Sequence, residues 1–237
     1  SSFVQDTITL KDDEWYAMIG SKFEHNDFTG FEIQPSARLW WTPDSRQVFW
    51  AAVSRPVHTP NRIDSDMNLT IASVDPGIIM GGPPAGFYVP VILQGNDDLD
   101  SEKLIAYELG YRVRLAEHFT WDTAGYFYDY DDIISFDDTN PQTFDNYGPA
   151  KSLGVETTLD YRPRDTLRLL ANYSYNHSSV EDPRIDLKPK SAQNMARLGA
   201  FWNITDDLEF NSMLYYNDNR NRHCTSYTSF MLSLIHI

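Results

Sequence analysis

The chain has 237 residues, one cysteine, and a formal net charge of −15. A chain this acidic repels phosphate backbones, which argues against nucleic acid as a partner. A single cysteine excludes an internal disulfide framework or a cysteine-rich zinc site, and 41% hydrophobic against 22% charged residues excludes a disordered chain.

Period-two alternation of apolar and polar residues dominates the chain, whereas helical periodicity is almost absent. Most of the alternating stretches carry about 10–13 residues, twice the ~5–6 of an average strand. A tilted strand needs ~9–11 residues to cross a bilayer, so their length favours a transmembrane barrel, and no stretch is apolar enough for a transmembrane helix. In chain order we predict ten strands over 3–10, 15–25, 31–42, 47–55, 104–115, 119–129, 152–162, 167–176, 194–204 and 208–216.

Short and long connections alternate along the chain. The short ones are polar and rich in Asp, Pro and Ser, as hairpin turns are, and lie at 11–13, 43–46, 116–118, 163–165 and 205–207. The others are mostly longer and lie at 26–30, 56–102, 132–149 and 178–192. A barrel in an outer membrane has short periplasmic turns and long extracellular loops, which this alternation matches. The segment 56–102 is rich in Pro, Gly and acidic residues, and loops this long are usually functional or disordered.

Charged side chains fall almost wholly on one face of the predicted strands. In lipid every backbone N–H and C=O needs an internal partner, and with no helix predicted a closed barrel is the remaining option. An arginine on the lipid face would cost roughly 2–4 kcal/mol at the midplane, so the charged face would line the lumen. The predicted lumen-facing residues are Arg38, Glu108, Arg112, Arg114, Glu156, Asp160, Arg168 and Arg197.

Aromatic residues stand where the predicted strands meet the turns. In an outer-membrane barrel such residues form a girdle at the membrane interface. The alternative is that they pack on the core of a soluble sheet, because soluble sheets are also enriched in aromatic residues. They are Trp15, Trp41, Phe119, Trp121, Tyr161, Trp202 and Phe210.

Three segments resemble TonB-dependent receptors, in the order and spacing of that family. The stretch 22–62, which begins KFEHNDFTGFEIQ, is similar to a mid-barrel part of these receptors. The segment 95–113, GNDDLDSEKLIAYELGYRV, resembles a motif that leads into a strand, and NYGPAKSLGVE at 146–156 resembles another strand entry. The resemblance covers about 3–216.

The resemblance implies an all-β, antiparallel, up-and-down transmembrane barrel of about 22 strands in the outer membrane of a Gram-negative bacterium. The chain would supply about ten of these strands and contact outer-membrane lipid. An N-terminal plug, absent from this chain, would fill the barrel and link it to the TonB–ExbB–ExbD complex. The implied function is energised uptake of a scarce, bulky ligand: a ferric siderophore first, or cobalamin, haem or a glycan.

Long outer loops would capture this small-molecule or metal-chelate ligand. Aromatic rings and arginine can hold a bulky anionic chelate by stacking and charge. Each residue could equally serve ordinary loop packing or lie on a solvated surface. The candidate ligand-binding residues are His58, Arg62, Phe87, Tyr88 and Tyr147.

The sequence offers no catalytic residue, metal site or cofactor motif. Its histidines are scattered, without an H-E-x-x-H pair, and the acids at 97–100 and 131–132 lack EF-hand spacing. Acid pairs such as Glu108 with Glu156 or Asp160 more readily pair with Arg112, Arg114 or Arg197 than act on a glycoside. We therefore predict a protein that is not an enzyme. The alternatives to the receptor are a passive porin or adhesin barrel and a secreted glycan-binding β-sandwich.

We predict one domain, a partial receptor barrel over 1–216, followed by an uncertain tail over 217–237. The last six residues, LSLIHI at 232–237, resemble the translation of a sequencing adapter, and we interpret them as non-native read-through. The alternative is a genuine apolar end of a strand.

Overall fold

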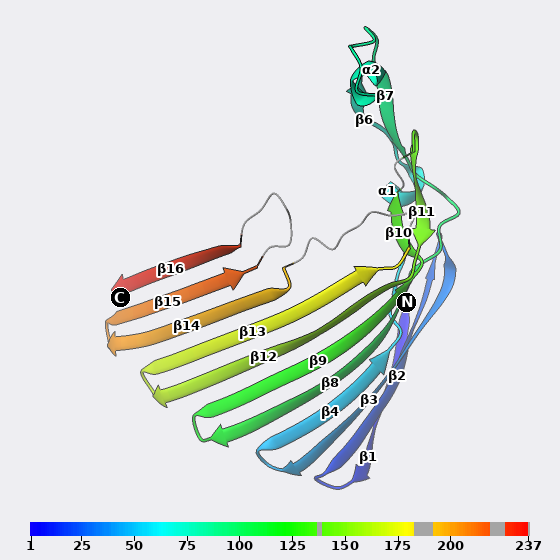
Figure 1. Ribbon diagram of the computed structural model, residues 1–237. Coiled ribbons are helices and arrows are strands. Elements are labelled where there is room, and N and C mark those ends of the chain that lie inside the picture. Colours follow the sequence, from blue (N-terminus) through cyan, green and yellow to red (C-terminus); the bar gives the residue numbers. More distant parts are fainter. Residues whose placement is uncertain (137–138, 183–191, 219–225, 237) are drawn as a thin grey trace.

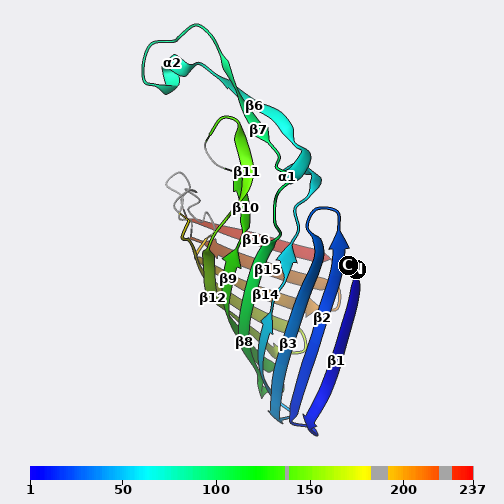
Figure 2. The ribbon, with the colours of Figure 1, turned by 90° about the vertical axis from the view of Figure 1, so that its right-hand side faces the viewer.

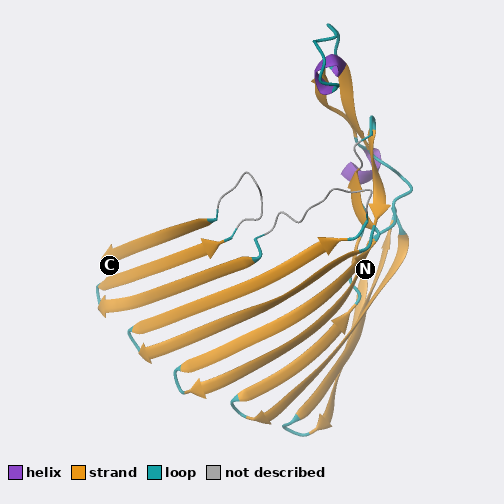
Figure 3. Cartoon of the chain, in the orientation of Figure 1, coloured by secondary structure: helices purple, strands orange, loops and turns teal. Residues whose placement is uncertain are grey.

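The computed structural model describes residues 1–136, 139–182, 192–218 and 226–236. The described residues form two sheets, one of twelve strands and one of four. Figure 1 shows the large sheet as a curved fan of long strands, with the small sheet lying beyond one end of these strands. In Figure 3 strands account for most of the chain, and helix is confined to two short pieces in the small-sheet region.

The large sheet is an antiparallel meander. Its eleven principal strands lie in the order β1-β2-β3-β4-β8-β9-β12-β13-β14-β15-β16, and the two-residue β5 pairs with β8. The strands are β1 (Ser2–Lys11), β2 (Trp15–Asn26), β3 (Gly30–Asp44), β4 (Gln47–Ser54), β5 (Val57–His58), β8 (Glu102–Ala116), β9 (Phe119–Asp131), β12 (Ala150–Arg164), β13 (Leu167–Val180), β14 (Asn194–Thr205), β15 (Leu208–Asn217) and β16 (Tyr227–His236).

All ten predicted strands are present in this sheet, which confirms the expected partial up-and-down barrel. The structure adds β5 and β16, neither of which the alternation had indicated. β16 pairs with β15 in an unbroken antiparallel register from Asn217↔Tyr227 to Leu208↔His236. The segment 232–237, interpreted above as read-through, thus contributes residues 232–236 to a paired strand.

Short turns and long loops lie at opposite ends of the strands of the large sheet. The short hairpin turns after β1, β3, β8, β12 and β14 all lie at one end of the strands, which we call the turn end (Figure 3). The opposite end of the strands, the loop end, carries the longer connections and the small sheet (Figure 2). The predicted alternation of short and long connections is therefore also a separation in space.

The small sheet lies in the order β10-β11-β7-β6 at the loop end. It combines β6 (Asn68–Val74) and β7 (Val89–Gln94) with β10 (Ile133–Phe136) and β11 (Gln142–Tyr147), and the parallel pair β7–β11 joins the two segments. The helices α1 (Arg62–Asp66) and α2 (Pro76–Ile79) flank β6 in the chain. Neither helix is long enough to span a membrane. The segment 56–102 thus contains strands and short helices between irregular stretches.

The register of the large sheet assigns every strand residue to one of two faces, because directly opposed residues of antiparallel strands point the same way. Arg38, Ala52, Glu108 and Tyr126 form one such row across four strands. A neighbouring row, Val53–Tyr107–Phe127–Leu153, points to the other side. We call the first side the polar face and the second the apolar face.

The apolar face is exposed, and no second layer of protein covers it within the described parts of the chain. Leu109 is 67% exposed, Leu198 53% and Val53 42%. Leu109 and Leu198 lie in the middle of long strands, and Val53 is paired with Ala37 in the middle of β3. A soluble β-sandwich buries this face against a second sheet. The observed arrangement instead matches a barrel wall whose outer side contacts another apolar phase.

Candidate functional site

The eight charged residues predicted to share one face do so. Two rows of the register account for half of them. Arg38 and Glu108 lie in one row, and Arg112 and Arg197 lie in the other, which reads Arg112–Asp122–Thr158–Asn172–Arg197. Arg114, Glu156, Asp160 and Arg168 occupy alternate positions on the same strands and therefore the same face.

The charged side chains of the polar face pair differently from the expectation. Arg112 Nε donates to Asp122 Oδ2 at 2.6 Å, and Arg168 Nη2 donates to Asp160 Oδ2 at 2.6 Å. Glu108 accepts a hydrogen bond of 2.9 Å from the Tyr128 hydroxyl instead of pairing with an arginine. Arg38 and Arg197 lie over aromatic rings, with the guanidinium carbon of Arg38 5.1 Å from the centre of Trp50.

A row of aromatic rings crosses the apolar face near the turn end. Trp15 stacks on Trp41 at 5.5 Å between centroids, Trp41 on Phe49 at 5.3 Å, and Phe49 on Tyr111 at 4.3 Å. Trp121 continues the row, with its ring edge-on to Tyr111. Phe49 and Tyr111 were not among the predicted girdle residues, although they occupy apolar-face positions of the alternating pattern in the predicted strands.

A second set of aromatic rings lies toward the loop end of the same face. Phe31 and Phe23 stack at 6.3 Å, and Phe31 is ten residues from Trp41 along β3. At ~3.3 Å per residue this is about 33 Å along the strand, or about 25 Å across a membrane at the strand tilt of ~40° usual in such barrels. The two aromatic levels are therefore spaced as the two interfaces of an outer membrane are.

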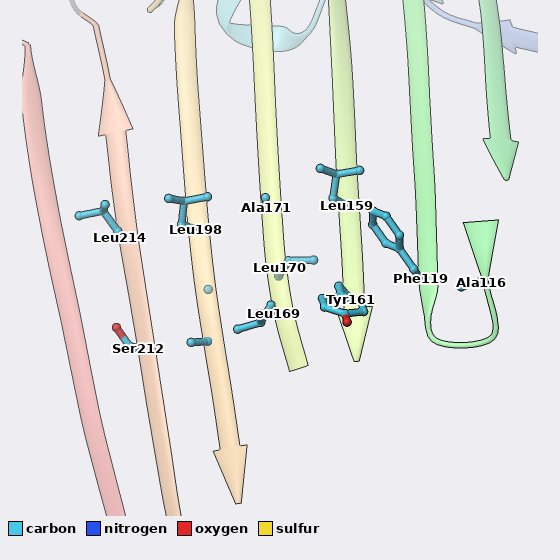
Figure 4. Close-up of a pocket in the computed structure, with 12 residues that line it drawn as sticks. Ala116, Phe119, Leu159, Tyr161, Leu169, Leu170, Ala171, Leu198, Ser212 and Leu214 are labelled. Atoms are coloured by element: carbon cyan, nitrogen blue, oxygen red, sulfur yellow. The ribbon is translucent and has the colours of Figure 1, made fainter. Parts of the chain in front are cut away.

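A groove of the large sheet lies on the apolar face (Figure 4). It measures about 830 Å³ and lies over β12 to β15, where Leu159, Leu169, Leu198 and Leu214 surround the smaller Ala171. Its lining is mostly hydrocarbon, with the hydroxyl groups of Ser212 and Tyr161 as the polar side-chain groups among the lining residues. We assign it to the surface that faces the apolar phase.

A different groove lies on the polar face at the loop end, where three tyrosines follow one another on β9. Tyr126 and Tyr128 stack at 4.6 Å, and Tyr130 lies edge-on to Tyr128. The groove measures about 410 Å³, and Ser152, Asn176 and Ser178 line its opposite side. The Ser152 hydroxyl donates to Asn176 Oδ1 at 2.9 Å. We call it the tyrosine groove, and its rings and hydroxyl groups can stack on and hydrogen-bond a ligand.

The tyrosine groove was not predicted, although its sequence signal exists. Tyr126, Tyr128 and Tyr130 are spaced by two residues, which places them on one face of any strand. The alternating pattern alone indicates only a strand. The groove also needs residues of β12 and β13, which come from a distant part of the chain.

The two motifs that resemble strand entries of the receptor family meet at the base of the small sheet. Asn146 Oδ1 accepts from the Asp100 N–H at 2.8 Å, and Asn146 Nδ2 donates to the carbonyls of Asp100 and Asp132 at 3.0 and 2.7 Å. Asn96 Nδ2 donates to the Phe144 carbonyl at 3.0 Å. These amides join the segments before β8 and before β12, and so fix the small sheet to the large one.

Three of the buried side chains among the described residues belong to this junction. Leu99 is 4% exposed, Tyr147 4% and Ser101 2%. The Ser101 hydroxyl donates to Glu32 Oε1 at 2.5 Å, which also attaches the junction to β3. Because Tyr147 is part of this buried cluster, its ring has almost no surface to offer an external ligand.

The other four predicted ligand-binding residues lie in separate places. His58, on β5, has its Nδ1 2.8 Å from Glu102 Oε2, while Arg62 opens α1 and is exposed. Phe87 and Tyr88 are 57% and 73% exposed at the tip between α2 and β7. The structure therefore does not gather the predicted five into one site, and only Phe87 and Tyr88 are neighbours.

One carboxylate organises the tip that carries Phe87 and Tyr88. Asp75 is 7% exposed and accepts backbone N–H bonds from Gly77 and Ala85 through Oδ1, at 2.9 and 2.8 Å, and from Gly86 through Oδ2 at 3.2 Å. These bonds, that from Ala85 foremost, hold the pKa of the Asp75 carboxyl below its usual value. Gly86, at a φ of +79°, turns the chain back toward Asp75.

In the residues with described positions, no group of three or more His, Cys, Asp and Glu side chains is placed to hold a metal ion.

The comparisons with known proteins agree with this geometry. The family model "TonB dependent receptor-like, beta-barrel" matches residues 1–234, while a search of curated proteins found no match. The siderophore receptor PirA from Pseudomonas aeruginosa superposes with a TM-score of 0.77 at 18% identity, over 98% of this chain and 41% of that one. PirA from Acinetobacter baumannii gives 0.75 at 17%, over 98% and 38%.

A third similar structure is the ferric enterobactin receptor PfeA from Pseudomonas aeruginosa, whose G324V mutant has a TM-score of 0.74 at 18% identity, over 97% of this chain and 36% of that one. The chain thus spans about two fifths of the length of the solved receptors it resembles. The matched family is that of TonB-dependent receptor-like barrels, and the fold is that of the solved siderophore receptors. The chain belongs to the TonB-dependent receptor-like β-barrel family.

Proposed function

We propose that this chain forms part of the wall of an outer-membrane receptor that imports a scarce, bulky ligand with energy delivered through TonB. The observation that carries the proposal is the two-faced sheet: the apolar face bears exposed leucines between two aromatic levels, and the polar face bears all eight predicted charged residues. Membership of the TonB-dependent receptor-like family supports the proposed transport role. The polar face would line the lumen, and the apolar face would contact outer-membrane lipid.

The ligand that we propose is a metal chelate, with a ferric siderophore as the first candidate. The support is that similar structures include receptors named for siderophores and for ferric enterobactin. The tyrosine groove offers stacked rings and hydroxyl groups at the loop end of the polar face, where an incoming ligand would first meet the barrel wall. Phe87 and Tyr88 at the exposed tip would make an earlier, looser contact.

The partners of the proposed receptor are a plug inside the barrel and the TonB–ExbB–ExbD complex. Arg38, Arg114 and Arg197 on the polar face are available to hydrogen-bond a plug surface. A passive porin would need no such partner, so dependence on TonB separates the two.

Growth under iron limitation tests the proposal. A strain in which the gene for this protein is disrupted should fail to grow on ferric enterobactin as the iron source, and a restored copy should rescue growth only when TonB is present. Growth that survives the loss of TonB would indicate a passive pore. Unchanged growth of the disrupted strain on this and other ferric siderophores would argue against iron uptake.

The tyrosine groove can be tested in the same strain. Replacing Tyr126 and Tyr128 together by Leu removes both hydroxyl groups and the stacked pair, and should weaken ligand binding by about tenfold or more. Tyr107→Leu is the matched control, because Tyr107 lies on the neighbouring strand but on the apolar face. Equal losses in both variants would contradict a role for the groove.

A further inference from the structure

The groove of Figure 4, which we call the apolar groove, lies near the turn end of the apolar face. Two rows of the register cross it. The row nearer the middle of the strands is Leu159–Ala171–Leu198–Leu214, and the row nearer the turn end is Tyr161–Leu169–Ala200–Ser212. Each row spans three strand spacings of ~4.8 Å, or about 14 Å. The groove is therefore wide enough for two hydrocarbon chains side by side.

The apolar groove exists because two small side chains, Ala171 and Ala200, lie between larger ones. Leu198 and Leu214 beside them are 53% and 37% exposed. Lipid tails are as apolar as leucine, so how well they pack decides where they stay on such a face. An unfilled hollow would leave its lining without contact atoms on one side. A hydrocarbon chain that lies over the two alanines would restore these contacts.

The two rows differ in polarity along the strand direction. The four side chains of the middle row are hydrocarbon, whereas the turn-end row carries the hydroxyl groups of Tyr161 and Ser212. One row further toward the turn end lie the rings of Trp202 and Phe210, at the predicted membrane interface. From the middle of the strands to the turn end the groove therefore offers hydrocarbon, then hydroxyl donors, then the interface. A phospholipid has the same order of acyl chains, ester groups and head group.

The hydroxyl groups of Tyr161 and Ser212 have no hydrogen-bond partner among the residues that the structure describes. Other donors of the apolar face do have partners within the sheet. The Tyr111 hydroxyl donates to Gln47 Oε1 at 2.8 Å, and Trp121 Nε1 donates to Thr157 Oγ1 at 2.8 Å. A hydroxyl group in hydrocarbon costs free energy unless it is hydrogen-bonded. The two hydroxyl groups of the apolar groove therefore need an acceptor from outside the sheet.

We propose that the apolar groove binds one phospholipid of the membrane leaflet at the turn end. Its acyl chains would lie over Ala171 and Ala200, and its ester carbonyl oxygens would accept hydrogen bonds from the hydroxyl groups of Tyr161 and Ser212. Tyr161 is 44% exposed and its ring packs edge-on to Phe119 at 5.4 Å, which leaves the hydroxyl accessible and limits the motion of the ring. In a barrel with short periplasmic turns this is the periplasmic leaflet.

The lipid site rests on the proposed contact of the apolar face with outer-membrane lipid. It goes beyond that contact, because it assigns one defined lipid to four strands, β12 to β15, and names the two side chains that select it. Lipid on the rest of the face would exchange freely, whereas a lipid hydrogen-bonded in the groove would be retained when the membrane is dissolved.

The test compares two phosphatidylethanolamines of equal chain length, one with ester-linked and one with ether-linked chains, because the ether lipid lacks the carbonyl oxygens. The protein is purified from outer membranes, stripped of lipid in detergent and titrated with each lipid, and native mass spectrometry counts the lipids bound. One ester lipid should bind per protein, about threefold or more tightly than the ether lipid. Tyr161→Phe combined with Ser212→Ala should abolish this preference.

Filling the hollow tests the acyl contact separately. Ala200→Phe should weaken the binding of both lipids by about tenfold or more. The fold should persist, because the added ring lies on an exposed face. Ala37→Phe is the matched control, since Ala37 lies on the apolar face opposite Ile19 and Val53, outside the groove. Tyr107→Phe, also on the apolar face outside the groove, controls for the loss of a hydroxyl group. Both controls should leave lipid binding unchanged.

Absence of a bound lipid, equal binding of the two lipids, or an equal loss in the Ala37 variant would overturn the lipid site. A lipid-free dimer that Ala200→Phe dissociates would also overturn it, because the groove would then be an interface between two copies. Because the assay involves no transport, these results leave the uptake proposal standing. Conversely, selective lipid binding by a protein that supports no uptake would overturn the uptake proposal alone.

Discussion

The large sheet and the small sheet differ in the interactions that stabilise them. The large sheet has almost no buried core: its strands are held by backbone hydrogen bonds, and its large apolar side chains are exposed on one face. The small sheet is held to it by a few amide side chains and a compact buried junction around Leu99, Ser101 and Tyr147. The first depends on the medium around it, whereas the second depends on specific contacts.

This difference predicts which substitutions destabilise each sheet. The large sheet should tolerate polar substitutions on one face and not on the other, because the cost is set by what lies outside the protein. The small sheet should respond to the loss of single hydrogen bonds while the large sheet remains intact.

The largest effect is expected from a charge on the apolar face. Val53→Arg should lower the free energy of unfolding in lipid bilayers by about 2–4 kcal/mol, whereas Ala52→Arg, on the polar face of the same strand, should cost little. Urea titration of the bilayer-folded protein measures both. Because Val53 is already 42% exposed, a soluble protein would accept either arginine, so equal stability of the two variants would refute the membrane assignment.

A smaller loss in the free energy of unfolding is expected when a methyl group is added at Gly110, next to the Trp50 ring. A Cβ at Gly110 would lie 2.3 Å from the Trp50 ring, whereas a Cβ at Gly125 would have no atom nearer than 3.7 Å. Gly110→Ala should therefore cost about 1–3 kcal/mol and alter the near-ultraviolet circular dichroism of tryptophan, while Gly125→Ala should do neither. Adding Trp50→Leu should relieve the Gly110→Ala defect, and failure of that rescue would count against a steric cause.

Removing one amide should separate the two sheets locally. Asn146→Ala loses three hydrogen bonds to Asp100 and Asp132 and should lower the opening free energy of β10 and β11 by about 1–2 kcal/mol. Hydrogen exchange should show faster exchange in β10 and β11 with unchanged protection of β8 and β9. Asn203→Ala in β14 is the control. Faster exchange across the whole large sheet would show that the sheets do not act as separate units.

The smallest expected effect is a pH-dependent change in the local stability of the tip between α2 and β7. The pKa of Asp75 is lower in the folded state than in the unfolded state, so its stabilisation is complete above the unfolded value of about 3.8 and is lost as the pH falls through the lower folded value. Limited proteolysis by pepsin should therefore cut the tip more readily at the acidic end of that window. Asp75→Asn should loosen the tip at neutral pH and remove the pH dependence; a tip equally resistant in both proteins would contradict this role for Asp75.

Much of the large sheet could be predicted because its information is local. Alternation of period two places Arg38 and Glu108 on one face and Leu39 and Leu109 on the other whatever their neighbours are. The Asp-rich turns mark the hairpins, and Trp15 and Trp41 mark the turn-end aromatic level. β16 was missed because its residues, from Tyr227 to His236, lie in the tail that was set apart from the fold.

The candidate site was harder to predict because it depends on distant pairings. The parallel pairing of β7 with β11 places Leu93 opposite Gln142. The sequence of neither segment indicates that the two strands pair. Tyr147 looked like an exposed loop tyrosine and is buried because the segment around Leu99 packs at the same junction.

By itself the sequence determined the strands, their two faces and the alternation of turns and loops, because a strand's side-chain period and a turn's chemistry are properties of a few consecutive residues. Only the tertiary structure decided which strands are neighbours, and hence that Ser152 and Asn176 line the tyrosine groove and that Arg197 lies opposite Asn172 in the sheet. Register between strands is set by packing and hydrogen bonding across the whole sheet, which no single segment encodes.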